Sequence, residues 1–253
     1  MIGNSIFLRN LKQFRLVTFD ITETLLRFRQ APAIQYAKTA AHLGVTDIDQ
    51  PLLEQCFKDE FKTMTKLYPN YGRYSHLTWY DWWAQLVDRI FRCVKPSIDE
   101  KKLKEISETL IKIYRTNECW IHIDGNQELL SRVRQANKHI GVISNFDPSL
   151  HKVLNEMKIL NKFDFVLTSY EAGYQKPDKS IYDIPLEKYG VKAEEALHIG
   201  NTYDLDYLGA RNAGWSSLLV TRNEVDLERA QNTHAYPSLR DLLLALDTKR
   251  IQW

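Results

Sequence analysis

The chain contains few cysteines and no long apolar run in its 253 residues. The three cysteines, Cys56, Cys93 and Cys119, show neither metal-ligand spacing nor a disulfide framework, so we expect reduced thiols in an intracellular protein. No apolar run approaches the ~18 residues that a membrane span requires, so we expect no membrane partner. The formal net charge is only +2, which gives no reason to expect nucleic acid or an anionic membrane surface as a partner.

Internal repeats and low-complexity segments are also lacking, and hydrophobic and charged fractions of 44% and 26% are typical of a soluble globular protein. The length allows one large α/β domain or a domain with a smaller insertion. The first 19 residues contain Arg9, Lys12 and Arg15 but no acid, as some mitochondrial presequences do. Because Leu16–Asp20 already has the pattern of a core strand, we favour a cytoplasmic protein and keep the nucleus and the mitochondrion as alternatives.

A block of amphipathic helices is predicted over residues 28–118, where no convincing strand occurs. We expect helices over 31–43, 51–66, 79–93 and 98–115. Thr78 and Asp81 have the capping-box spacing at the start of the third helix. Ser97 and Glu100 have the same spacing at the start of the fourth.

From Gly125 onward, predicted strands alternate with predicted helices. We expect strands over 139–144, 163–169, 196–200 and 216–220, and helices over 126–136, from Asp147, over 178–189, over 204–213 and from Ser238. This alternation implies an α/β fold, with a parallel sheet that has helices on both faces. We therefore expect a core formed by 1–27 and 119–253, with 28–118 inserted after the first strand as a helical cap.

Asp20 is the most informative residue, because it directly follows the strand-like run Arg15–Phe19. A carboxylate at this point lies at the carboxyl end of a sheet, where open α/β sheets bind ligands. Three later segments also follow predicted strands: Ser144–Asn145, Lys176–Asp178 and Gly200–Asp206. Their hydroxyl, amino and carboxylate groups can converge with Asp20 on one phosphate-sized site.

The order and spacing of these segments resemble the four motifs of the haloacid dehalogenase (HAD) superfamily, which here begin with Asp20–Leu26. A closer resemblance is to the animal group called haloacid dehalogenase-like hydrolase domain-containing protein 3, with the insect rhythmically expressed gene 2 protein. It rests on four segments: Leu67–Gly72, Trp82–Trp83, Ile143–Pro148 and Gly200–Tyr207. The resemblance implies a HAD-like Rossmannoid fold with an inserted helical (C1-type) cap and hydrolase chemistry.

The resemblance also implies a nucleophilic role for Asp20, whose carboxylate would form a covalent intermediate that water then hydrolyses. Taken alone, this residue has a plainer interpretation as a turn cap. Hydroxyls can hydrogen-bond the nucleophile and a phosphoryl oxygen, or merely stabilise turns, and a lysine can neutralise the developing anion. The expected catalytic residues are Asp20, Thr24, Ser144 and Lys176, and the expected substrate contacts are Thr22, Ser144, Asn145 and Lys176.

Magnesium is the expected cofactor, held by Asp20, the backbone carbonyl of Thr22 and Asp206, since it prefers hard oxygen ligands. Two positions depart from the phosphatase pattern that the chain resembles. Thr22 replaces the acid expected two residues after the nucleophile, and general acid–base catalysis typically contributes ~100- to 10,000-fold. Asn201 replaces a metal-linked Asp, so it is a doubtful ligand and magnesium affinity should fall.

Three functions stay open. A weak or specialised magnesium-assisted phosphomonoester hydrolase, with a small phosphate ester as its partner, is the first. A metal-free 2-haloacid dehalogenase is the second, because halide departure needs no proton. Such enzymes use an arginine to hold halide and substrate, and no arginine here matches it in register; Arg27 and Arg29 are the nearest. A binding or regulatory protein with degraded catalysis is the third. The aromatic stretch from Tyr68 to Trp83 is predicted mainly as cap core, and secondarily as a surface for stacking substrate.

Overall fold

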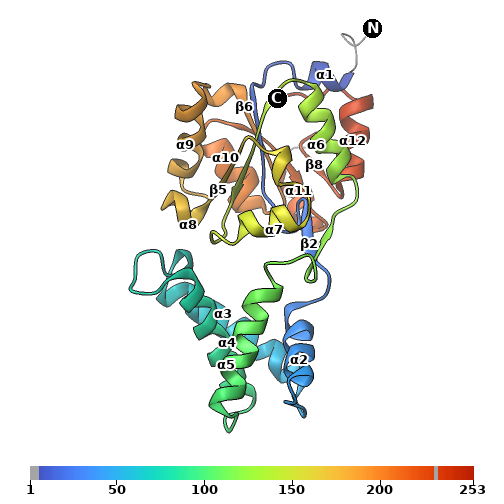
Figure 1. The fold of residues 1–253 in the computed structure, drawn as a ribbon. Coiled ribbons are helices and arrows are strands. Elements are labelled where there is room, and N and C mark those ends of the chain that lie inside the picture. Colours follow the sequence, from blue (N-terminus) through green and yellow to red (C-terminus); the bar gives the residue numbers. More distant parts are fainter. Residues whose placement is uncertain (1–5, 231–232) are drawn as a thin grey trace. The chain divides into compact units, whose positions relative to one another are not determined.

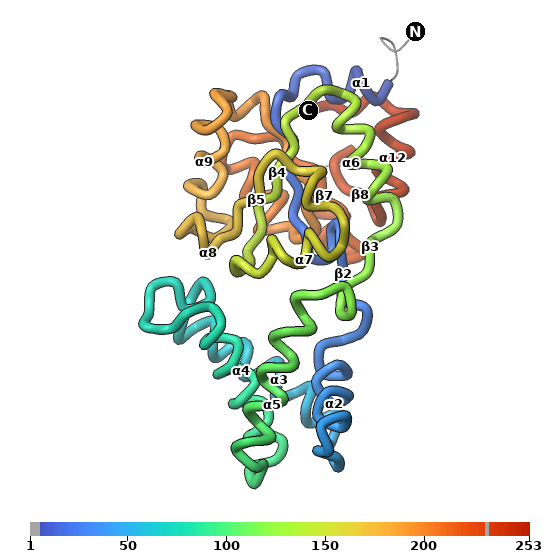
Figure 2. The backbone as a smooth tube through the Cα atoms, viewed as in Figure 1, coloured from blue at the N-terminus to red at the C-terminus, as the bar shows by residue number. Residues whose placement is uncertain are grey.

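The computed structural model describes residues 6–230 and 233–253, and the chain divides into two compact units. The α/β unit contains Met1–Arg27, His122–Asn145 and Lys158–Trp253, and the helical unit contains Phe28–Ile121 and Phe146–Met157. Residues 146–157 thus group with the helices, although the sequence analysis left them in the core. The chain runs from β2 (Leu26–Phe28) into the helical unit and returns through β3 (Trp120–His122), with which β2 pairs (Figure 2). A capping role for the helical unit stays a prediction.

A six-stranded parallel sheet forms the centre of the α/β unit, which confirms the fold class expected from the sequence. Its strands, in spatial order, are β5 (Phe165–Thr168), β4 (His139–Ser144), β1 (Leu16–Phe19), β6 (Ala196–Gly200), β7 (Ser216–Val220) and β8 (Ala235–Tyr236). β1 lies between β4 and β6, and all its residues are buried. Burial of every position fits a strand that is covered on both faces.

Helices cover both sides of this sheet (Figure 1). On one side lie α1 (Ile6–Asn10), α6 (Asn126–Gln135) and α12 (Leu239–Thr248), and on the other α8 (Ser169–Ala172), α9 (Lys179–Tyr189) and α10 (Gly209–Asn212). The short helix α11 (Glu224–Arg229) follows β7. Asp178 caps α9 as predicted, since its carboxylate accepts a hydrogen bond from Ser180 N over 2.9 Å. The helix predicted over 204–213 is instead a π-helix, Tyr203–Leu208, followed by α10.

The helical unit contains α2 (Pro32–His42), α3 (Gln50–Leu67), α4 (Trp79–Val94), α5 (Glu100–Ile113) and α7 (Leu150–Glu156). Apolar positions at helical spacing meet in one core, in which Leu53, Trp82 and Ile106 are fully buried. The capping box of Thr78 and Asp81 is confirmed. Among the residues that the structure describes, no helix is both long enough and apolar enough to cross a lipid bilayer.

The second predicted capping box is wrong. Asp99 accepts a hydrogen bond from Lys102 N over 3.0 Å, so α5 begins at Glu100 and Ser97 lies outside it. The strand β3 lies where no strand was predicted, because three residues are too few to show a hydrophobic period.

Asp147 does not begin the helix that was predicted from it. Its carboxylate accepts hydrogen bonds from Ser149 N and from Trp83 Nε1, each over 2.7 Å, and α7 starts only at Leu150. An aspartate that bonds its own backbone two residues on stabilises a turn, and this turn delays the helix.

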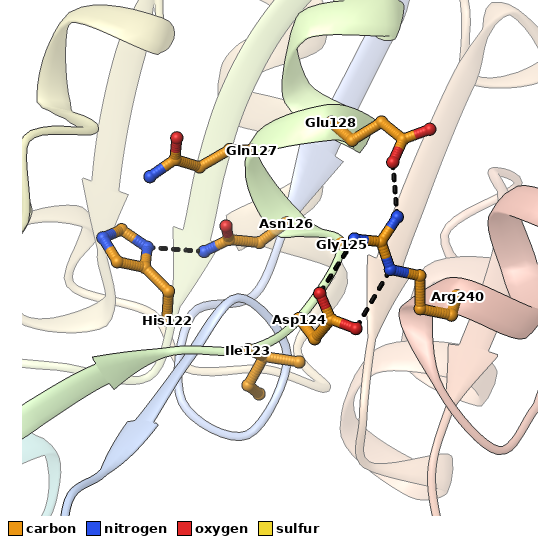
Figure 3. A pocket seen from close by; sticks show the side chains of 8 residues that line it. All are labelled: His122, Ile123, Asp124, Gly125, Asn126, Gln127, Glu128 and Arg240. Atoms are coloured by element: carbon orange, nitrogen blue, oxygen red, sulfur yellow. Dashed lines mark hydrogen bonds and ion pairs between the residues drawn. The ribbon is translucent and has the colours of Figure 1, made fainter.

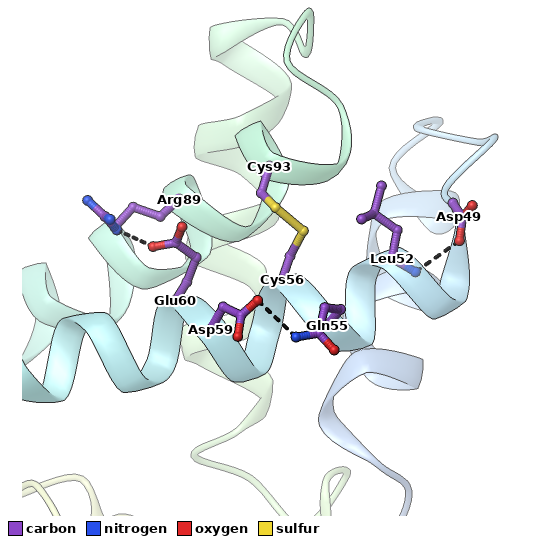
Figure 4. Close-up of a disulfide and its surroundings, with 8 residues drawn as sticks. All are labelled: Asp49, Leu52, Gln55, Cys56, Asp59, Glu60, Arg89 and Cys93. Carbon is purple, nitrogen blue, oxygen red and sulfur yellow. Dashed lines mark hydrogen bonds and ion pairs between the residues drawn. A yellow bond between two sulfur atoms is a disulfide. The ribbon is translucent and has the colours of Figure 1, made fainter.

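A disulfide corrects the prediction of three reduced thiols. Cys56 in α3 and Cys93 in α4, 37 residues apart, are bonded within the helical unit (Figure 4). Of the cysteines, Cys119 is a free thiol; it is buried, and burial raises its pKa to about 12. The spacing gave no sign of this pair, because the pairing depends on how α3 packs against α4. Disulfides are rare in reducing compartments, so cysteine content no longer supports an intracellular location.

Candidate active site

The register of the sheet places Asp20 at its carboxyl edge. Phe19, the last residue of β1, pairs with Val142 of β4 and with Ile199 of β6. Asp20 N donates a hydrogen bond to the Ile199 carbonyl over 2.9 Å, so the carboxylate follows directly from the ladder. Because these strands are parallel, the residues that follow β4 and β6 emerge at the same edge, where open α/β sheets bind ligands.

A buried lysine joins two buried carboxylates at this edge. Lys176 Nζ donates to Asp20 Oδ1 over 2.7 Å, to Asp206 Oδ1 over 2.6 Å and to the Ile143 carbonyl over 2.9 Å. The lysine, Asp20 and Asp206 are only 4%, 7% and 2% exposed. An ammonium group has three N–H donors, so all of them are satisfied here. Asp20, Lys176 and Asp206 therefore converge at one edge of the sheet, as their positions after predicted strands suggested.

Two further groups besides the lysine hydrogen-bond the Asp206 carboxylate. Its Oδ2 accepts from Thr202 N over 2.9 Å, and its Oδ1 lies 3.1 Å from His198 Nε2. An ionised carboxylate can only accept, so Nε2 carries the proton and Nδ1 accepts from the Thr18 hydroxyl at 2.9 Å. Sequence reasoning gave neither Thr18 nor His198 a role here. The only available signal was a polar residue inside an otherwise apolar strand.

The backbone before Asp206 is shaped to admit its carboxylate. Asp206 lies in the π-helix Tyr203–Leu208, which follows the end of β6. A Cβ atom added at Gly200 would lie 2.3 Å from Asp206 Cγ, which is closer than real atoms approach. Glycine at this position therefore allows the carboxylate to lie against the end of the strand.

Burial and charge shift the pKa values of these groups in different directions. Burial raises the pKa of Asp20 above its ordinary value and repulsion from Asp206 adds to this, although Lys176 and a hydrogen bond from Ser144 oppose it. Burial also disfavours ionised Asp206, but Lys176 and His198 outweigh it and hold that pKa well below the usual range. Burial disfavours charged Lys176 too, yet the two carboxylates raise its pKa. Burial lowers the pKa of His198, which is therefore neutral.

The remaining predicted residues surround this group in different ways. Ser144 is buried and its hydroxyl favours ionised Asp20, and the side chain of Asn145 bonds the backbone of Lys176. Thr24 is fully buried, and its hydroxyl donates to Asn201 Oδ1 over 3.3 Å. Thr22 is half-buried, and its backbone forms an isolated bridge to residue 26.

The donor set fits a single, weakly held cation. Two carboxylates against one ammonium leave one uncompensated negative charge at this edge. Both oxygens of Asp206 already accept hydrogen bonds, and the Asn201 amide oxygen accepts from Thr24. In the described part of the chain, no cluster of three His, Cys, Asp or Glu side chains could hold a metal ion. A divalent cation would therefore depend on Asp20, the Thr22 carbonyl, water and substrate oxygens, as magnesium commonly does.

A separate pocket on the α/β unit, of about 500 Å³, contains no predicted site residue (Figure 3). Its lining runs from His122 to Glu128 and includes Arg240. The Arg240 guanidinium is paired with Asp124 and Glu128, and Asn126 Nδ2 donates to His122 Nδ1 over 2.8 Å. Because its polar groups satisfy one another, this pocket does not compete with Asp20 as a candidate site.

Sequence relatives agree with the motif resemblance. A family model described as haloacid dehalogenase-like hydrolase matches residues 14–214. Rhythmically expressed gene 2 protein from Drosophila melanogaster is 36% identical, covering 97% of this chain and 100% of its own length. Haloacid dehalogenase-like hydrolase domain-containing protein 3 from Bos taurus is 35% identical, covering 93% of this chain and 94% of its own. The closer resemblance predicted from the motifs is confirmed.

Solved structures share the fold. A 2-haloacid dehalogenase from Pseudomonas syringae pv. Tomato DC3000 has a TM-score of 0.61 at 18% identity, covering 92% of this chain and 98% of its own. A predicted phosphoglycolate phosphatase from Haemophilus somnus 129pt has a TM-score of 0.60 at 17% identity, covering 92% and 97%. YfnB from Bacillus subtilis, bound to magnesium, has a TM-score of 0.62 at 18% identity, covering 92% and 98%. With a family model and close relatives over nearly its whole length, this chain belongs to the haloacid dehalogenase-like hydrolase family.

Proposed function

We propose that the protein is a hydrolase that acts on small phosphate monoesters through a covalent intermediate on Asp20. The observation that carries this proposal is the buried Lys176 bridge between Asp20 and Asp206. A structural aspartate at a strand end does not need a buried counter-ion, whereas a nucleophile must stay ionised although burial opposes it. The ion pairs of Lys176 with both carboxylates support this role for Asp20.

In the proposed reaction an Asp20 oxygen attacks phosphorus and the bond from phosphorus to the ester oxygen breaks. The ester oxygen takes a proton from solvent water and departs as the alcohol. Water then attacks the aspartyl phosphate, which releases phosphate and restores the carboxylate. Lys176 keeps Asp20 ionised and offsets charge on the phosphoryl group, and the Ser144 hydroxyl can donate to either. Thr22 cannot protonate the alcohol as it leaves, so substrates with good leaving groups should react fastest.

Magnesium would be held by Asp20, the Thr22 carbonyl and, through water, Asp206, and it would supply positive charge for the phosphoryl oxygens. YfnB, which shares the fold, is bound to magnesium, and this supports the proposal. We further propose that the helical unit acts as a cap that selects a small-molecule substrate.

A 2-haloacid dehalogenase is the second candidate, and Thr22 is the observation that favours it. Attack of Asp20 on the halogen-bearing carbon expels halide, which needs no proton. Arg29 is not free to hold halide, because its guanidinium donates to the backbone carbonyls of residues 117, 118 and 120. Of the two arginines nearest the expected register, Arg29 is therefore not available for that role.

The test compares wild type with Asp20→Asn on an aryl phosphate and on a short 2-haloacid, each with and without magnesium. Magnesium-dependent phosphate release that the substitution abolishes would support the phosphatase. Metal-independent halide release that it abolishes would support the dehalogenase. Asp59→Asn, which changes an exposed acid of the helical unit, should behave as wild type. Turnover that survives in Asp20→Asn would overturn both, and no turnover of any kind would favour a binding protein.

A further inference from the structure

The aromatic stretch from Tyr68 to Trp83 separates into two classes in the structure. Trp82 is fully buried and donates its Nε1 to the Tyr68 carbonyl over 2.9 Å, so it belongs to the core of the helical unit. Trp79 and Trp83, one turn apart on α4, are only half-buried. Packing in the core therefore explains why position 82 is a tryptophan. It does not explain why Trp79 and Trp83 keep part of their indole rings exposed.

An arginine with unused donors lies against one of these indoles. Arg115 follows the end of α5, and its Cζ lies 5.5 Å from the centroid of the Trp79 ring. Its Nε is buried and has no hydrogen-bond partner. A buried donor without an acceptor is unfavourable in a native protein and is a specific reason to look for a ligand.

A buried acid whose pKa Arg115 affects, Asp147, already accepts hydrogen bonds from other groups. Asp147 is buried, and its oxygens accept from Ser149 N and from Trp83 Nε1. Burial raises the pKa of Asp147, and the positive charge of Arg115 is one of the groups that oppose this. Among the described residues, however, no carboxylate oxygen lies within 4.0 Å of the guanidinium. Asp147 thus orients Trp83 and leaves the fork of Arg115 open.

We propose that Arg115, together with Trp79 and Trp83, binds a small oxyanion, either a carboxylate or a phosphate group. The planar guanidinium matches the two oxygens of such a group, and the Trp79 ring lies against one side of it. The indole of Trp83, anchored by Asp147, supplies an apolar wall beside the anion. Calling this anion part of the substrate rests on the proposed function, whereas the binding itself does not.

The experiment follows the Arg115 Nε–H and Trp79 Nε1–H signals by nuclear magnetic resonance in ¹⁵N-labelled full-length protein. Acetate and inorganic phosphate are titrated separately at constant ionic strength. We expect a saturable shift of both signals, and the anion that causes it identifies the ligand as carboxylate or phosphate. In Arg115→Gln, affinity read at Trp79 should fall by about tenfold or more. Arg115→Lys, which keeps the charge but not the fork, should also bind more weakly.

A matched control is Arg92→Gln, because Arg92 lies in the same unit but is already paired with Asp88 and Glu100. It should bind the anion as wild type does. The proposal is overturned if neither anion gives a saturable shift, or if Arg115→Gln binds as tightly as wild type. Asp20→Asn should keep the Arg115 response while turnover is lost. Failure of this inference and failure of the proposed chemistry therefore give different results.

Discussion

Asn145 and the backbone of Lys176 hold each other through two hydrogen bonds. Lys176 N donates to Asn145 Oδ1 over 2.8 Å, and Asn145 Nδ2 donates to the Lys176 carbonyl over 2.9 Å. Asn145 directly follows β4, so the loop that carries the lysine is tied to the end of a central strand. The buried ammonium is therefore fixed from its backbone as well as by its two carboxylates.

Lys176→Met should destabilise the protein by about 3–5 kcal/mol at neutral pH, because it leaves two buried carboxylates without a counter-ion. Urea unfolding measures the loss. Lys179→Met removes an exposed ion pair with Asp183 and should cost at most about 1 kcal/mol. Equal effects of the two substitutions would contradict the buried bridge.

Asp20→Asn should raise the stability at neutral pH while it abolishes turnover. The pKa of Asp20 is raised in the folded state, so the folded chain holds the proton more tightly than the unfolded chain. That contribution to stability is present at low pH and is lost as pH rises through the folded pKa. The gain should therefore shrink as pH falls toward the ordinary value of an aspartate. A variant less stable than wild type at neutral pH would argue against a raised pKa.

Thr22→Asp should speed hydrolysis of alkyl phosphates by about 100- to 10,000-fold, because it restores a group that can protonate the leaving oxygen. Aryl phosphates with good leaving groups should gain little. Initial rates on the two substrate types give the comparison, and Thr22→Asn is the control that adds a polar group without an acid. A similar gain on both substrates would point to an effect other than proton transfer.

Asn201→Asp should lower the magnesium concentration needed for half-maximal activity, on the order of tenfold, since it adds a negative charge to a weak oxygen site. In the part of the chain that the structure describes, the Asn201 amide oxygen accepts from Thr24 alone, so a carboxylate can take its place. A magnesium titration of activity measures the shift. An unchanged requirement would place the cation away from residue 201.

Cys56→Ser with Cys93→Ser should cost about 2–4 kcal/mol under oxidising conditions, as expected for a disulfide across 37 residues. Adding a thiol reductant to wild type should give the same loss in urea unfolding. Cys119→Ser is the control, and its response to the reductant should equal that of wild type. If the reductant leaves wild type unchanged, the two cysteines are not bonded in solution.

The sheet could be predicted from the sequence because its central strands are short, mostly apolar runs that alternate with helices. β6 and β7 have the predicted bounds, 196–200 and 216–220. Asp20, Lys176 and Asp206 were also predictable as one group, since residues that follow parallel strands meet at one edge. The π-helix was not predictable, because its form depends on where Asp206 must lie rather than on local periodicity.

Contacts between residues far apart in the chain could not be predicted from the sequence. Thr18 and His198 become neighbours only through the register of β1 with β6, where they are paired across the strands. Cys56 and Cys93 likewise meet only when α3 packs against α4. Arg115 gave no signal either, since one arginine after a helix is common and its buried Nε is a property of the packed unit.

Because Gly200 lies so close to Asp206, the substitutions that evolution can accept at these two positions depend on each other. While the carboxylate is present, no side chain fits at residue 200, because even a methyl carbon would lie 2.3 Å from Asp206 Cγ. A lineage in which Asp206 is lost first can then accept alanine at position 200. A lineage that keeps Asp206 cannot accept alanine there, because the added carbon would collide with the carboxylate. Among descendants of this sequence, a larger residue at 200 would therefore mark a protein that had already given up the acid and, with it, the proposed chemistry.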